Sequence, residues 1–170
     1  MEEEKTKPEE WVEMRIRGVL VDPSSDVPVV LLRDDAQGVF LPIWIGAFEA
    51  SAIAMAIEGI EVRRPMTHDL LRMSIESLGA TLVRLEIWKL EEGTFFGRLR
   101  MTTASGEILI DSRPSDGLAL ALRCKAPVWV AKDVLQGALQ LDLAIEKRDE
   151  EKLRQWLENA RPEDLPKYEM

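Results

Sequence analysis

The sequence has few of the residues that extracellular or zinc-dependent proteins rely on. Its one cysteine, Cys124, cannot form a disulfide within the chain, and its one histidine, His68, argues against a zinc hydrolase. No apolar run is long enough to cross a membrane, and the acidic residues 1–10 have no apolar segment of the kind found in a secretory signal. There is no glycine-rich phosphate loop either. We therefore expect a cytoplasmic protein with no membrane span.

Positive charge is also scarce. The chain has 22 Lys and Arg against 31 Asp and Glu, which gives a net charge of −9. Residues 1–10 and 141–170 each contribute −3, so residues 11–140 also carry only −3. No stripe of basic residues is present, and extended non-specific binding to duplex nucleic acid is therefore not expected. A small local patch that binds one phosphate is compatible with this balance.

The hydrophobic content of 46% and the charged content of 31% are typical of a globular protein. Periodicity and turn residues predict strands at residues 14–22, 27–33, 38–44, 80–90, 94–102, 107–112 and 126–130. They predict helices at residues 47–58, 67–78, 115–124 and 132–139, and an amphipathic helix at residues 149–160. The fold class is α+β, with a largely antiparallel or mixed sheet and interspersed helices in a single compact domain. We place this domain at residues 14–140, between a disordered acidic N-terminus (1–13) and a helical tail (141–170).

Two of the predicted helices begin with the same pattern of residues, RPMTHD at 64–69 and RPSD at 113–116. In each, an Arg-Pro pair precedes a hydroxyl residue and an aspartate. Thr67 and Ser115 are therefore predicted N-caps, and the aspartates complement the helix dipole. Two interpretations stay open. Either the pattern only starts helices, or the two helix ends converge on one anionic ligand.

Under the second interpretation, Arg64 and Arg113 would hold phosphate oxygens, each with two parallel hydrogen bonds. Asp69 and Asp116 would then compete with the anion unless a divalent cation lay between them. Carboxylates, phosphate and a metal together are the composition of Mg²⁺-dependent phosphodiester chemistry. Asp111 is predicted to end a strand at the same rim of the sheet.

His68 and Glu49 each admit a structural and a functional interpretation. Helical spacing aligns His68 with Leu71, Ile75 and Leu78 on a predicted core-facing stripe, yet a histidine can also act as a general acid or base. The same spacing aligns Asp69 with Arg72 and Glu76 on a predicted solvated face. Glu49 falls in the first turn of an almost entirely apolar helix, where a carboxylate lies near a rim or is paired.

Several motifs resemble the bifunctional nuclease domain family in order and spacing. They are LPIWIG (41–46), Glu49-Ala50, RPMTHDLL (64–71), LGA (78–80), EGTFF (92–96) and DSRPSDGLALA (111–121). The resemblance implies a compact α+β domain that is commonly dimeric, for which DNase and RNase activity has been proposed. One departure is Phe96, which stands where the family motif usually has a tyrosine.

Two hypotheses of different classes follow. The first is a nuclease that cleaves single-stranded or flexible DNA or RNA with Mg²⁺ or Mn²⁺ and forms a homodimer. Its candidate residues are His68, Asp69 and Asp116 for catalysis, Arg64 and Arg113 for the phosphate, and Glu49, Asp111 and Asp116 for the metal. The second is a non-catalytic dimeric module that binds a small anionic ligand or a protein partner.

Overall fold

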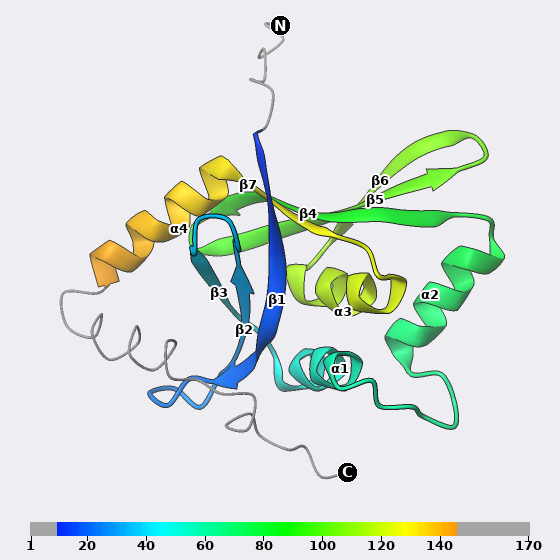
Figure 1. Cartoon of the computed structure of the whole chain (residues 1–170), viewed down its shortest axis with the longest axis horizontal. Helices are drawn as coiled ribbons and strands as arrows, with labels where there is room; N and C mark the ends of the chain where they lie inside the picture. Colours follow the sequence, from blue (N-terminus) through cyan, green and yellow to red (C-terminus); the bar gives the residue numbers. More distant parts are fainter. Residues whose placement is uncertain (1–9, 146–170) are drawn as a thin grey trace, which may run out of the picture.

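The chain folds around one seven-stranded sheet, as a computed structural model that describes residues 10–145 shows (Figure 1). The strands are β1 (Trp11–Val21), β2 (Pro28–Arg33), β3 (Phe40–Trp44), β4 (Thr81–Glu91), β5 (Thr94–Thr103), β6 (Gly106–Ser112) and β7 (Val128–Ala131). The helices are α1 (Ala47–Ile57), α2 (Thr67–Ser77), α3 (Pro114–Cys124) and α4 (Lys132–Ile145). A mixed sheet with interspersed helices in one compact domain confirms the predicted α+β fold.

The strand order is β3-β2-β1-β7-β4-β5-β6, and every neighbouring pair is antiparallel except β4 and β7. The predicted hairpin of β2 and β3 and the predicted meander of β4, β5 and β6 are both confirmed. β1 begins at Trp11 rather than at residue 14, because Trp11–Met14 pair with β7. No helix within residues 10–145 is long and apolar enough to cross a membrane. The predicted helix at 149–160 lies outside the described residues.

Helix α3 packs directly against the middle of the sheet. Its Gly117 faces Leu85 of β4 so closely that a Cβ at this position would overlap the Leu85 side chain. Leu118, Leu120 and Ala121 of the same helix are also buried. In Figure 1, α1, α2 and α3 lie together below β4, and α4 lies apart at the other end of the sheet. One face of the sheet therefore carries all three helices that hold predicted site residues.

The opposite face of β4 carries a buried cluster of charges. Glu86 is 0% exposed and accepts hydrogen bonds from the Nε atoms of Arg84 at 2.7 Å, Arg98 at 2.5 Å and Arg100 at 2.6 Å. The Arg84 and Arg98 guanidinium groups lie over the ring of Trp11, and each also lies over a second tryptophan, Trp129 or Trp88. These arginines therefore form part of the packing of this face.

Helix α2 is more exposed than its sequence pattern predicts. The stripe of His68, Leu71, Ile75 and Leu78 was expected to face the core, but Leu78 is 86% exposed and Leu71 is also exposed. Only His68 and Ile75 are half-buried, and Ile75 packs against the core cluster. The exposure of this stripe has a simple cause. α2 contacts mainly α3 and barely reaches the sheet, so one side of its stripe has nothing to pack on.

Candidate functional site

The first turns of three helices meet at one place. α3 lies between α1 and α2 and contacts both of them (Figure 1). Glu49 lies in the first turn of α1, Asp69 in that of α2 and Asp116 in that of α3. Because backbone N–H groups at a helix start are unpaired and positively polarised, each carboxylate is favoured where it stands. The two helix starts with the Arg-Pro pattern therefore do converge.

The start of α3 depends on a sharp turn out of β6. Arg113 is the N-cap, with φ −64° and ψ 142°, and Pro114 takes the first helical position, where its missing N–H costs nothing. Gly97 of β5 lies opposite Ser112, and a Cβ at Gly97 would come 2.8 Å from the Ser112 carbonyl oxygen. This glycine therefore gives the turn the room that places Arg113 over the helix starts.

The predicted N-caps were wrong by one or two residues. Met66 is the N-cap of α2 and Arg113 that of α3, so Thr67 and Ser115 lie inside their helices. Neither N-cap side chain makes a capping hydrogen bond. In α2 the start is stabilised by Asp69 instead, whose Oδ2 accepts the Met66 backbone N–H at 2.9 Å. The aspartate thus takes the capping role that the sequence suggested for the threonine.

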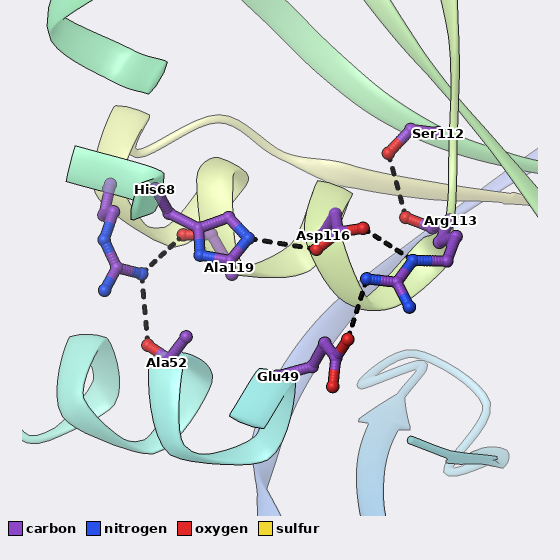
Figure 2. Close-up of polar contacts among 8 residues, drawn as sticks. Glu49, Ala52, His68, Ser112, Arg113, Asp116 and Ala119 are labelled. Carbon is purple, nitrogen blue, oxygen red and sulfur yellow. Dashed lines mark hydrogen bonds and ion pairs between the residues drawn. The ribbon is translucent and has the colours of Figure 1, made fainter. Parts of the chain in front are cut away.

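A continuous chain of polar contacts joins the three helices (Figure 2). Glu49 Oε1 accepts a hydrogen bond from Arg113 Nη2 at 2.7 Å, and Asp116 Oδ2 accepts one from Arg113 Nε at 2.7 Å. The other oxygen of Asp116, Oδ1, lies 3.1 Å from His68 Nε2. Figure 2 shows Arg113 between the two carboxylates, with Asp116 between Arg113 and His68. The chain is therefore one guanidinium, two carboxylates and one imidazole.

The charges of this chain hold Asp116 in its ionised form. Burial raises the pKa of Asp116, but hydrogen bonds from Arg113 and His68 outweigh burial and leave its pKa lowered. The two carboxylates in turn raise the pKa of Arg113. An ionised carboxylate only accepts hydrogen bonds, so His68 Nε2 must carry a proton. In a neutral His68, Nδ1 is then the ring nitrogen that can accept a proton.

A second arginine, Arg123, completes the junction, and the sequence interpretation missed it. Its Nε donates to Asp69 Oδ1 at 2.7 Å, and its Nη1 donates to the carbonyl oxygens of Ala52 and Ala119 at 3.1 and 2.8 Å. The side chain is 10% exposed and links all three helices. A sequence signal was present, because Arg123 follows Asp116 by seven positions, a spacing that places both on one face of α3.

Asp69 therefore does not lie on a solvated face, as predicted. It is half-buried and pairs with Arg123, whereas the predicted partner Arg72 pairs with Glu76 at 2.8 Å. Burial raises the pKa of Asp69, but the Met66 N–H and the Arg123 guanidinium outweigh burial, and its pKa is lowered. Asp69 holds the helix starts together rather than facing the Arg113 side of the cluster.

Two other predicted site residues lie outside the contact chain. Arg64 is exposed in the loop before α2, and within residues 10–145 no hydrogen bond or ion pair joins it to the other candidates. Asp111 is exposed and pairs across the strands with Arg98, whose side chain lies on the Glu86 face of the sheet. Because paired residues point to the same face, Asp111 points away from α3.

The structure consequently does not assemble Glu49, Asp111 and Asp116 as three ligands of one metal. Within the described residues, no three histidine, cysteine or acidic side chains form a group that could hold a metal ion. Glu49 and Asp116 alone are brought together, on the two sides of the Arg113 guanidinium. Mg²⁺ sites often use only one or two carboxylates together with substrate phosphate oxygens. Glu49 and Asp116 are therefore the two candidate metal ligands that lie near each other.

The protein is an α+β domain in which a chain of contacts, running from a carboxylate through an arginine and a second carboxylate to a histidine, joins the starts of three helices. Comparison with known proteins shows the family to which this domain belongs. The model of the bifunctional nuclease domain matches residues 30–141. This range includes every candidate site residue, and the chain belongs to this family. The resemblance noted from the motifs is confirmed.

Relatives of this chain fall into two groups. An uncharacterized protein of Mycobacterium tuberculosis is 38% identical over 162 residues, which span 90% of this chain and 97% of the relative. Bifunctional nuclease 1 of Arabidopsis thaliana is 26% identical over 118 residues, and bifunctional nuclease 2 of Oryza sativa subsp. japonica is 25% identical over 122 residues. These two matches span 68% and 69% of this chain but only 36% and 38% of the plant proteins.

Proposed function

We propose that this protein is a nuclease that hydrolyses phosphodiester bonds at the junction of α1, α2 and α3. One observation carries the proposal, namely the chain of contacts from Glu49 through Arg113 and Asp116 to His68. It combines a cationic group for the phosphate, two carboxylates and a group able to move a proton. Membership of the bifunctional nuclease domain family, and the names of its plant relatives, support the same chemistry.

Arg113 is the proposed phosphate ligand. Its side chain is 65% exposed, so it can turn from the carboxylates towards an incoming phosphate without leaving a buried site. A guanidinium matches two phosphate oxygens with two parallel hydrogen bonds. The starts of the three helices add positive potential at the same place. Arg64 stays a candidate for a second phosphate contact, since it is exposed just before α2.

Once Arg113 binds the phosphate, Glu49 and Asp116 lose their common cation. Mg²⁺ or Mn²⁺ is the proposed replacement for the guanidinium between these carboxylates. When bound, it would stabilise the negative charge that develops on the phosphate. His68 is the proposed general base, oriented by the Asp116 carboxylate through Nε2 and accepting a proton at Nδ1. In this scheme water attacks the phosphorus, the bond to the leaving oxygen breaks, the attacking water gives its proton to His68, and the leaving oxygen takes a proton from solvent.

The proposed substrate is single-stranded or flexible DNA or RNA. The three arginines of β4 and β5 surround Glu86 and are not arranged as a track beside the site. The net charge of −9 also disfavours long contacts with a phosphate backbone. We therefore expect weak binding that depends on one or two phosphates. The cytoplasmic location inferred from the sequence stays a prediction.

The decisive experiment compares wild type with Asp116→Asn for cleavage of labelled single-stranded DNA and RNA. Each is assayed with Mg²⁺, Mn²⁺ or EDTA after identical purification. Asn keeps the shape of the side chain but removes the charge that orients His68, so we expect a loss on the order of a hundredfold or more. Glu76→Gln is the matched control, because Glu76 forms only a surface pair with Arg72 on α2.

Each outcome separates the two functional hypotheses. Cleavage by wild type and Glu76→Gln, lost in EDTA and in folded Asp116→Asn, supports the nuclease. Equal cleavage by wild type and Asp116→Asn shows a contaminating nuclease or a different site. Absence of cleavage, together with saturable binding of inorganic phosphate that Arg113→Gln abolishes, supports the non-catalytic anion-binding module instead.

A further inference from the structure

The two edges of the sheet are built differently. β3, at one edge, is short, and its residues Leu41, Pro42 and Ile43 are buried. Pro42 has no N–H to offer to another strand, which protects this edge. β6, at the other edge, is exposed along its whole length from Gly106 to Asp111. Nothing lies beyond it in the described structure (Figure 1).

β6 has exposed apolar residues on both of its faces. Ile108, Leu109 and Ile110 are 42%, 50% and 42% exposed. Ile108 and Ile110 pair with the core residues Met101 and Leu99 of β5, so they face the helical side of the sheet. Leu109 points to the opposite side. An exposed edge strand with three consecutive apolar residues is a template for pairing with another strand, and natural edges are normally protected from it.

The sequence of β6 is nearly palindromic, EILID at residues 107–111. In a two-fold antiparallel pairing centred on Leu109, Leu109 meets its own copy, Ile108 meets Ile110, and Glu107 meets Asp111. This is the register that places all three apolar residues opposite apolar residues. Each of the two acids that meet has an arginine beside it on β5. Glu107 accepts a hydrogen bond from Arg100 at 2.9 Å, and Asp111 lies opposite Arg98.

We propose that β6 is the dimerisation strand and that two copies of this chain join there, antiparallel and centred on Leu109, into one continuous sheet. The occupant is a second copy rather than another protein because the apolar pattern of the strand complements itself, while Arg100 and Arg98 lie beside the acids that meet. Such an isologous contact closes on two copies. β6 ends one residue before Arg113, so the interface lies next to the start of α3. The proposal does not depend on the nuclease activity.

The oligomeric state tests the surface. Sedimentation equilibrium of the full chain should show a dimer at tens of micromolar. Leu109→Lys should be monomeric, because a lysine at the centre of an edge strand opposes strand pairing. Phe48→Lys is the matched control, since Phe48 is an equally large change on α1 and is 91% exposed, and it should remain dimeric. A monomeric wild type, or a dimeric Leu109→Lys, overturns the proposal.

Disulfide trapping tests the register and does not require a disruptive substitution. In a Cys124→Ala background, Leu109→Cys should cross-link to its own copy, because directly opposed Cα atoms lie roughly 4.5–5.5 Å apart. Glu107→Cys should not, since two copies of residue 107 would lie about 14 Å apart along the strands. Cross-linking of Glu107→Cys in preference to Leu109→Cys overturns the proposed register.

Discussion

The two faces of the sheet carry clusters built from the same groups in opposite proportions. On one face, the carboxylate of Glu86 is surrounded by three arginines and has no exposure. On the other, the single guanidinium of Arg113 lies between Glu49 and Asp116 and is largely exposed. Both clusters lower the pKa of a carboxyl group, Glu86 in one and Asp116 in the other, by hydrogen bonds that outweigh burial.

This difference shows which arrangement can exchange partners. The buried Glu86 cannot lose its arginines without becoming an unpaired charge in the interior, and it therefore fixes β4 to β5. Arg113 can leave its carboxylates for a phosphate, because its own side chain is 65% exposed and both carboxylates are only partly buried. A lowered pKa is common to both clusters and does not identify the functional one. Exposure and the ratio of cations to anions distinguish the Arg113 cluster, which is the proposed functional site. The following predictions test this distinction, in order of their expected effect on stability.

Glu86→Gln should have the largest effect. It leaves three arginines around a neutral amide, and breaking a buried ion pair of this kind typically costs roughly 3–5 kcal/mol of unfolding free energy. Chemical denaturation followed by tryptophan fluorescence measures the loss, because Trp88 neighbours Arg98 in this cluster. Glu76→Gln, at an exposed pair, should change stability by less than about 0.5 kcal/mol. Equal effects of the two variants would contradict the structural role of Glu86.

Arg123→Met should have the next largest effect. The substitution keeps the apolar stem but leaves Asp69 and the carbonyl oxygens of Ala52 and Ala119 without their donor. A lost hydrogen bond to a charged group costs about 1.5–3 kcal/mol, and we expect a loss in this range. Amide hydrogen exchange should show faster opening of α2 in particular. If the exchange of α2 is unchanged, Arg123 does not hold the helix starts together.

The fold was largely predictable from the sequence because its signals are local. Alternating apolar residues and turn residues located every strand, and the meander from β4 to β6 followed from its short connections. The start of β1 at Trp11 was missed, since it depends on pairing with β7, more than a hundred residues away. The exposure of Leu78 was missed for a similar reason. A helical stripe shows which residues share a face but not whether that face is covered.

The candidate site was predictable only in part. Helix-start patterns identified Glu49, His68, Arg113 and Asp116, because these residues are recognised by their place in a first turn. Their convergence depends on the tertiary packing of the three helices, which no local sequence pattern reveals. Asp111 was grouped with Asp116 because a strand end and the helix start after it lie at one rim of the sheet, but the alternation of β6 points Asp111 to the other face. Arg123 lies at the far end of α3, so a search confined to helix starts could not find it.

Acid should weaken the helix junction in a way that depends on Asp116. Its pKa is lowered in the folded protein, so its contribution to stability is present above the ordinary carboxyl pKa of about 4 and is lost as pH falls through the folded value. The difference in unfolding free energy between wild type and Asp116→Asn should therefore be largest near pH 6 and shrink towards pH 3. A difference that does not vary with pH would show that Asp116 contributes by packing rather than by charge.

Arg113→Gln should have the smallest effect on stability and the clearest effect on function. The carboxylates of Glu49 and Asp116 lose their donor, but both are only partly buried, so the loss of unfolding free energy should be smaller than for Glu86→Gln or Arg123→Met. Phosphodiester cleavage should fall on the order of a hundredfold, because the proposed phosphate ligand is gone. Arg113→Lys keeps the charge without the two parallel hydrogen bonds and should restore only part of the activity. If Arg113→Gln instead unfolds as readily as Glu86→Gln, Arg113 has the same structural role as the three arginines around Glu86. The proposed difference between the two faces of the sheet is then wrong.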